Sequence, residues 1–158
     1  MDVYREALAS LHPRMVIITH ASNVTGAVND AAVIAEEAKK AGAAVFLDAA
    51  QTAGVIPVLP ALWNMDMVAF TGHKYLLGPQ GTGALYVSPD IELAPVFTGG
   101  TGIYSDLDEM PVDYPIRLEA GTQNEQGMEV LAKCLHGRKI ILLICTGCWN
   151  MSICWRTL

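Results

Sequence analysis

Polar side chains that could bind or react with a ligand stand at the ends of consecutive apolar segments. They form three groups: His20 and Asn23, then Asp48 and Gln51, then Thr71, His73 and Lys74. In open α/β sheets, ligands bind at the carboxyl ends of the strands. If the apolar segments are parallel strands, the three groups face one crevice and can act on one ligand.

Asp48 and Lys74 suggest the most specific chemistry. A partly buried carboxylate at Asp48 could hold a protonated heterocyclic nitrogen, because an opposite charge offsets its desolvation. The Lys74 amine, held beside a carbonyl compound in a dry cleft, could form a Schiff base. The residues alone leave structural alternatives open: Asp48 could cap the turn that follows it, and Lys74 could be a solvated surface charge.

The neighbouring polar residues are less specific. Gln51 could reach the same ligand from one helical turn away, or it could be a capping-box partner or a surface amide. Thr71 could donate its hydroxyl to an anion or simply end a strand, and His73 could be a turn residue. The stretch 78–83, GPQGTG, lacks the lysine and hydroxyl that end a P-loop and does not fit GxGxxG, so it predicts a sharp turn.

The elements that must position these residues follow from the apolar pattern. Strands are expected at 14–20, 43–51, 65–70 and 83–87, and helices at 2–10, at 31–41 and within 121–135. Asn29 or Asp30 can cap the second helix, and Gly42 can close it. Continuously apolar strands that alternate with a helix predict an α/β fold with a parallel or mixed sheet covered on both faces.

Composition narrows the class of protein. Of the 158 residues, 52% are hydrophobic and 16% are charged, which predicts a globular domain with a well-buried core. The net charge of −6 and the absence of a basic stripe argue against nucleic acid as a partner. The first residues contain no apolar secretory segment, so a cytoplasmic location is expected.

Four segments together resemble a known family. They resemble, in order and spacing, the class V family of pyridoxal-phosphate enzymes. The segments are THASNVTGAVND, VFLDAAQTAG, DMVAFTGHKYLLGPQGTGALYV and RLEAGTQN. That family includes cysteine desulfurases, selenocysteine lyases and related aminotransferases. The resemblance covers residues 2–133 and implies the central part of the large domain of a fold type I transferase. That domain has a mostly parallel sheet with flanking helices and would be incomplete here.

The resemblance implies a role for most of the polar residues in binding pyridoxal 5'-phosphate. Lys74 would form the Schiff base with the cofactor and then serve as the general base at the alpha carbon of an amino-acid substrate. Asp48 would pair with the pyridinium nitrogen, so that the ring acts as an electron sink. Asn23 and Gln51 would contact the side of the ring that carries the 3-hydroxyl group.

The same resemblance extends to the phosphate and to a second subunit. Thr71 and His73 would contact the phosphate, and His73 is also a candidate catalytic residue beside Lys74. Thr122 matches a residue that reaches the phosphate site of the partner subunit in relatives, which implies a homodimer. No metal is implied.

The chain departs from the family in length. The phosphate-binding loop and the residue that stacks on the ring would lie upstream. The small domain with the substrate-carboxylate arginine and the mobile cysteine of desulfurases would lie downstream. Two hypotheses follow: a PLP-dependent transferase or lyase whose parent protein is active, or a truncated, inactive fragment that serves at most as a binding or interaction module.

The tail, residues 134–158, differs in composition from 1–133. It holds all four cysteines and two of the three tryptophans, and it has no acidic residue. We interpret it as out-of-frame or otherwise unrelated sequence. Cys145 and Cys148 form a lone CxxC, a weak signal for zinc or redox chemistry. The uncharged run 140–155 is shorter than the ~20 residues needed to span a bilayer, so a membrane is not expected as a partner.

Overall fold

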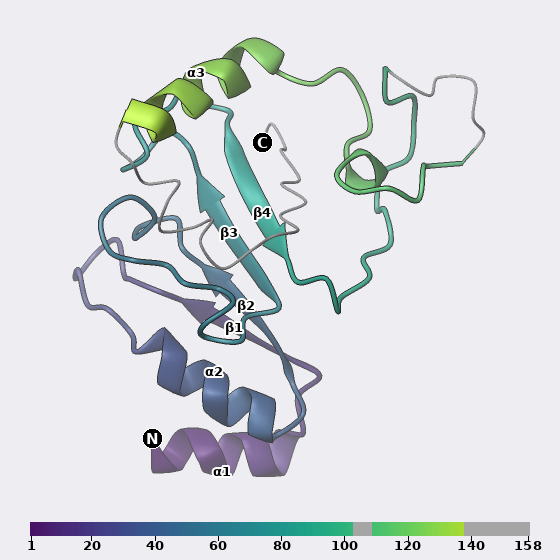
Figure 1. Cartoon of the computed structure of the whole chain (residues 1–158). Helices are drawn as coiled ribbons and strands as arrows, with labels where there is room; N and C mark the ends of the chain where they lie inside the picture. The colour runs from purple at the N-terminus through teal and green to yellow at the C-terminus, as the bar shows by residue number, and fades with distance from the viewer. Residues whose placement is uncertain (103–108, 138–158) are drawn as a thin grey trace.

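The computed structural model describes residues 1–102 and 109–137. Within them lie three α-helices, four strands and one 3-10 helix (Figure 1). In chain order these are α1 (Asp2–Leu11), β1 (Met15–Thr19), α2 (Ala31–Lys40), β2 (Ala44–Asp48), β3 (Met67–Thr71), β4 (Gly83–Val87), η1 (Ile116–Leu118) and α3 (Glu125–Gly137). Each strand and helix predicted from the apolar pattern is present, with its ends shifted by a few residues at most.

The four strands form one sheet in the order β1-β2-β3-β4. β1, β2 and β3 are parallel, and β4 pairs antiparallel with β3. Asp48 lies opposite Thr19 on one side and opposite Ala69 on the other. The mostly parallel α/β sheet predicted from the sequence is therefore confirmed, and β1, β2 and β3 end at the same edge.

Helix α2 covers one face of the sheet through small residues. Asp30 is its N-cap, and the Asp30 side chain accepts a hydrogen bond from Val33 N at 3.2 Å. Ala31, Ala35 and Ala38 recur at helical spacing and are buried in the core. Because these side chains are short, the helix packs close to the strands, and Val45 and Leu47 of β2 belong to the same core cluster.

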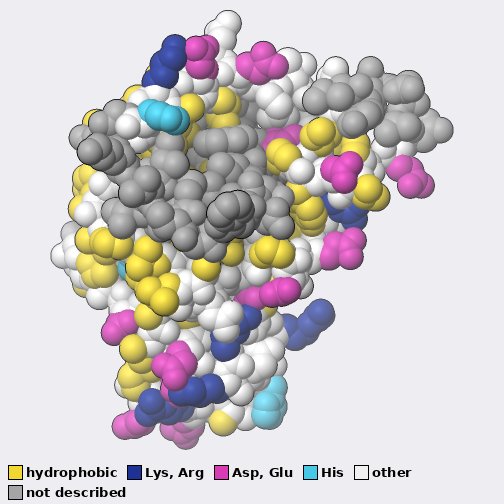
Figure 2. All heavy atoms as spheres, viewed as in Figure 1, with side chains coloured by type: hydrophobic (Ala, Val, Ile, Leu, Met, Phe, Trp, Pro, Cys, Tyr) yellow, Lys and Arg dark blue, Asp and Glu magenta, His cyan; other side chains and the backbone are white. Residues whose placement is uncertain are grey.

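Helix α1 is fastened to α2 rather than to the sheet. Tyr4 donates a hydrogen bond to Ile34 O at 3.1 Å, and Arg5 Nε donates to Glu37. Hydrogen bonds from Arg5 and, to a smaller extent, from Lys40 lower the pKa of Glu37 to about 2. Lys40 also pairs with Glu36 at 2.8 Å, as the i,i+4 spacing predicts. Charged side chains accordingly gather over α1 and α2 in Figure 2.

The opposite face of the sheet differs from the prediction. Met15 is 46% exposed and Ile17 is 68% exposed, although both lie on strand β1. They alternate with Val16 and Ile18, which pack toward the core. Within residues 1–102 and 109–137, the helix that contacts the strands covers one face, so the expected two-sided cover is not seen there.

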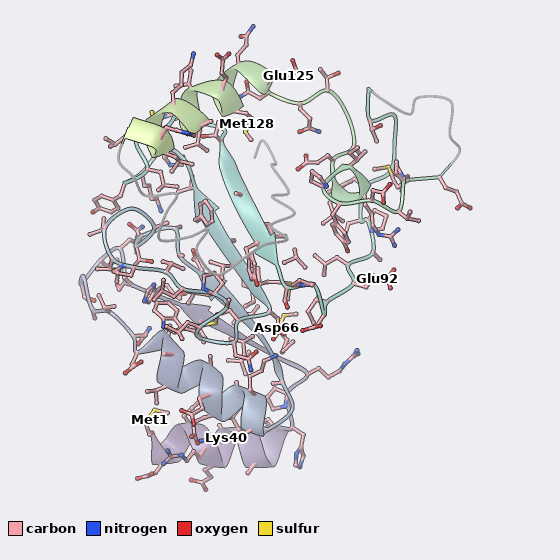
Figure 3. The ribbon with its side chains drawn as sticks, in the orientation of Figure 1. Met1, Lys40, Asp66, Glu92, Glu125 and Met128 are labelled. Carbon is pink, nitrogen blue, oxygen red and sulfur yellow. The ribbon has the colours of Figure 1, made fainter. Side chains whose placement is uncertain are left out.

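Asp66 ties the amino end of β3 to three other elements. It is 5% exposed, and its carboxylate accepts hydrogen bonds from Lys39 Nζ on α2 at 2.7 Å and from Val45 N on β2 at 2.6 Å. Its backbone oxygen accepts from Ser88 N, just after β4, at 2.7 Å. Figure 3 shows Asp66 at the end of the sheet away from α3. This residue fixes the strands at one end while the polar groups occupy the other.

The long segment between β4 and α3 is held together by hydrogen bonds to Leu93. Residues 88–102 and 109–121 contain no strand, and Tyr114 and Arg117 tie this segment together by hydrogen bonds to the backbone of Leu93. Helix α3 continues through Cys134 to Gly137. The rest of the tail, with Cys145 and Cys148, lies outside the described residues. Among those described, no helix is both long enough and apolar enough to cross a membrane.

Candidate functional site

The three polar groups emerge from one edge of the sheet. His20 N donates to Asp48 O at 2.9 Å, so β1 and β2 stay paired up to their ends. Ala49 N donates to Ala69 O at 2.8 Å and does the same for β2 and β3. The predicted convergence of the strand ends is therefore present in the structure.

A hollow of about 390 Å³ opens beside β2, β3 and β4 at this edge. Its size falls within the ~300–1,000 Å³ typical of small-molecule sites. Its lining is mainly apolar and includes two polar side chains, those of Asp48 and Thr71. The lining residues are Phe46, Asp48, Ala50, Ala69, Phe70, Thr71, Gly83, Ala84 and Leu85. A flat apolar ring with one cationic atom suits such a lining, because the carboxylate can neutralise that atom out of water.

Asp48 has a structural role as well as a place in the hollow. Its Oδ1 accepts a hydrogen bond from Ala50 N at 2.9 Å, so it caps the turn that follows β2. The capping alternative is thus observed. In the part of the chain that the structure describes, Oδ2 receives no hydrogen bond from another residue, and this oxygen is available to a ligand.

Thr71 and His73 form a pair at the end of β3. Thr71 Oγ1 lies 2.8 Å from His73 Nδ1 and 3.4 Å from Thr82 O. A hydroxyl that donates to the carbonyl oxygen accepts from the His73 ring, and the His73 side chain is exposed. The two side chains predicted to contact a phosphate therefore lie together.

Lys74 lies on the loop between β3 and β4, and this loop is held at several points. Gly72 N donates to Thr82 O at 2.7 Å, and Gly78 N donates to Gly72 O at 2.8 Å. An added Cβ at Gly72 would lie 2.1 Å from Thr82 Oγ1, so only glycine fits this crossing. Lys74 itself is half-buried and does not line the hollow.

The turn after β2 touches the Lys74 loop directly. Gly54 has φ 92° and faces the backbone of Tyr75, where an added Cβ would lie 2.7 Å from Tyr75 O. The segment that begins at Asp48 and the segment that carries Lys74 are thus packed against each other. This contact makes the segments that carry Asp48 and Lys74 neighbours in space.

The other predicted site residues are more dispersed. Asn23 is exposed in the loop 22–28, where Ser22 Oγ accepts from Val24 N at 3.2 Å. Gln51 is half-buried in the turn after β2, and Thr122 is exposed just before α3. None of these three lines the hollow. Their predicted contacts with a cofactor stay predictions.

Sequence reasoning did not assign a role to Thr52 or to the His20 ring. Thr52 Oγ1 and His20 Nδ1 lie 2.8 Å apart and form a hydrogen bond. Both residues are buried: Thr52 is 2% exposed and His20 is 4% exposed. Trp63 packs edge-on to the ring with the centroids 5.6 Å apart. Burial lowers the pKa of His20. The signal that could have suggested the pair is Thr52 itself, a hydroxyl directly after Gln51 in a turn of small residues.

Comparison with known proteins settles the family. The model described as aminotransferase class-V matches residues 2–138. The chain belongs to this family. A probable cysteine desulfurase of Methanothermobacter thermautotrophicus is 43% identical over 119 residues, which are 72% of this chain and 30% of that protein. A cysteine desulfurase of Haloferax volcanii is 40% identical over 113 residues, 69% of this chain and 26% of that protein.

Solved structures confirm the fold. The apo cysteine desulfurase of Thermococcus onnurineus aligns with a TM-score of 0.75 and 30% identity, over 90% of this chain and 36% of that one. The cysteine desulfurase CsdA of Escherichia coli aligns with a TM-score of 0.72 and 31% identity, over 84% of this chain and 35% of that one. The chain therefore has part of the fold of these enzymes and spans about a third of their length.

Proposed function

We propose that this class V chain carries the central cofactor-binding segment of a PLP-dependent transferase or lyase of the cysteine desulfurase type that acts on an amino acid. Two observations support this: the turn that begins at Asp48 packs against the loop that carries Lys74, and Asp48 and Thr71 line a mainly apolar hollow. Pyridoxal phosphate, when bound, supplies an aldehyde that condenses with an amine and a ring that withdraws electrons from the substrate.

The residues of this chain would divide the binding of the cofactor among them. Asp48, through its free Oδ2, would keep a proton on the ring nitrogen. Thr71 and His73 would hold the phosphate, and Asn23 and Gln51 would contact the ring hydroxyl. The chemistry of these donors fits the group: one carboxylate, a hydroxyl with an imidazole, and two amides.

Lys74 would bind the aldehyde carbon and would later move a proton at the alpha carbon of the substrate. Its backbone lies on a loop that is held by backbone hydrogen bonds among Gly72, Gly78 and Thr82. These bonds restrict the positions that the Lys74 amine can reach. A group held in place in this way reacts more readily than a free one. Thr122 would contribute to the site of a partner subunit, and the proposal includes a homodimer in the cytoplasm.

We further propose that this chain alone turns over little or no substrate. The supporting observation is the open sheet face, where Ile17 is 68% exposed next to the strand that carries Asp48. A cofactor site with one wall exposed to water lacks the water exclusion and the fixed donors that catalysis requires. Loss of a single well-placed donor typically costs about 3 kcal/mol of transition-state stabilisation.

An absorbance titration tests the cofactor site. Pyridoxal phosphate added to the chain should produce a visible band that Lys74→Ala abolishes. Lys133→Ala is the matched control, because that lysine is exposed on α3 and paired with Glu129 at 2.7 Å. The control should keep the band. A band of equal intensity in Lys74→Ala would mean that surface lysines react, and the proposal would be wrong.

A further inference from the structure

His20 connects two parts of the candidate site through its backbone and its side chain. Its N–H donates to Asp48 O at 2.9 Å, and its carbonyl accepts from Asn29 N at 2.9 Å. Its Nδ1 lies 2.8 Å from Thr52 Oγ1. Thus a single residue at the end of β1 contacts both ends of the turn from Asp48 to Thr52.

The direction of the side-chain hydrogen bond follows from the neighbours. Thr52 Oγ1 donates to Ala49 O at 3.3 Å, so its lone pair accepts from His20 Nδ1–H. In this arrangement the ring carries a proton on Nδ1. Trp63 lies edge-on to the ring at an interplanar angle of 80° and restricts its rotation.

The turn itself is tightly closed by backbone hydrogen bonds. Thr52 N and Ala53 N both donate to Ala49 O, at 3.0 and 2.9 Å. Two residues beyond Thr52, Gly54 packs on the Tyr75 backbone, next to Lys74. A displacement of Thr52 would therefore move Gln51 and also the surface on which the Lys74 loop rests.

We propose that His20 is a positioning residue of the cofactor site: through Thr52 it holds the turn that carries Asp48 and Gln51 against the loop that carries Lys74. It touches neither cofactor nor substrate. This inference rests on the proposed function, because a positioning role requires a cofactor at the hollow.

Five single variants of the full chain separate positioning from bulk stability. His20→Leu removes the donor, whereas His20→Asn places an amide nitrogen near the site of Nδ1. Thr52→Val removes the acceptor at nearly constant volume, whereas Thr52→Ser keeps the hydroxyl. Leu8→Ala is the stability control, because Leu8 is buried and lies on α1, outside the candidate site. Each is measured by the Kd for pyridoxal phosphate, by the circular dichroism of the bound cofactor and by thermal unfolding.

His20→Leu and Thr52→Val should each raise the Kd about tenfold, the amount expected for one hydrogen bond, and should alter the circular dichroism of the cofactor. His20→Asn and Thr52→Ser should bind pyridoxal phosphate nearly as tightly as the unsubstituted chain. The double variant should bind no more weakly than either single variant, because both changes break the same bond. Where His20→Leu fails to fold, Thr52→Val provides the same test.

The outcomes distinguish this inference from the proposed function. If the unsubstituted chain gives no Lys74-dependent band, the proposed function fails and the positioning role falls with it. If that band is present but His20→Leu and Thr52→Val bind as tightly as the unsubstituted chain, only the positioning role is wrong. It is also wrong if Leu8→Ala weakens binding as much as they do.

Discussion

Replacement of Asp66 tests how the strands that carry the candidate site are held. In Asp66→Ala, the amide of Val45 and the ammonium of Lys39 both lose their acceptor. The site lies at the other end of β3, so the change touches no predicted cofactor contact. We expect a large loss of stability and little direct effect on cofactor geometry.

The magnitude follows from the two lost partners. Val45 is fully buried, and an unpaired buried N–H costs ~1–3 kcal/mol. Removal of one member of a fully buried ion pair costs ~3–5 kcal/mol, but the Lys39 side chain is 27% exposed and can regain water. We therefore expect the free energy of unfolding to fall by about 3 kcal/mol in total. Asp66→Asn should lose about half of this, because its amide oxygen can still accept one hydrogen bond.

Urea unfolding measures this loss. With a slope of ~2 kcal/mol/M, the midpoint for Asp66→Ala should fall by about 1.5 M. Asp90→Ala is the control, because Asp90 is exposed, and its midpoint should stay nearly constant. A double-mutant cycle with Lys39→Met isolates the ion pair. If Asp66→Ala loses no more stability than Asp90→Ala, the assignment of Asp66 as the anchor of β3 is refuted.

Three further variants or conditions test other parts of the structure. Burial lowers the pKa of His20 below its ordinary 6.5, so His20 takes up a proton in the unfolded chain at a higher pH than in the folded chain. Thermal stability should therefore decline as the pH falls below 6.5, and His20→Asn should abolish this decline. Gly72→Ala should cost ~1–3 kcal/mol or more in urea unfolding, because its Cβ would lie 2.1 Å from Thr82 Oγ1, whereas Gly99→Ala, with open space around it, should cost little. Ile17→Thr should change stability by less than ~0.5 kcal/mol, and a loss above ~1.5 kcal/mol would show that the open sheet face is covered in the folded protein.

The sequence predicted the elements well because their signals are local. Continuous apolar runs gave the strands, and Asp30 before an alanine-rich segment gave the start of α2. The alternation of strands and helix predicted a parallel or mixed sheet, and a parallel arrangement would place Asp48 and Thr71 on neighbouring strand ends. These inferences require only spacing along the chain.

The contacts that hold the site could not be predicted in the same way. Asp66 bonds to Lys39 and Val45, and His20 bonds to Thr52 across a separation of 32 residues. In the sequence, Asp66 is an ordinary polar residue at the start of the predicted strand 65–70. Its burial depends on the packing of α2 against β2, which no local pattern encodes. The two-sided cover of the sheet was expected because the strands are apolar along their whole length. That pattern does not say which segment covers each face.

The two long-range contacts lie at opposite ends of the parallel strands. Asp66 holds β3 to β2 at the amino end of β3, and His20 with Thr52 holds the turn at the carboxyl end of β2. If the candidate site occupies the carboxyl edge, a change at the amino end should lower the free energy of unfolding without altering the cofactor affinity of the molecules that remain folded. A change at the carboxyl end should alter affinity beyond its effect on stability. Variants at Asp66 and His20 compared in the same titration thus locate the site on the sheet without any assay of turnover.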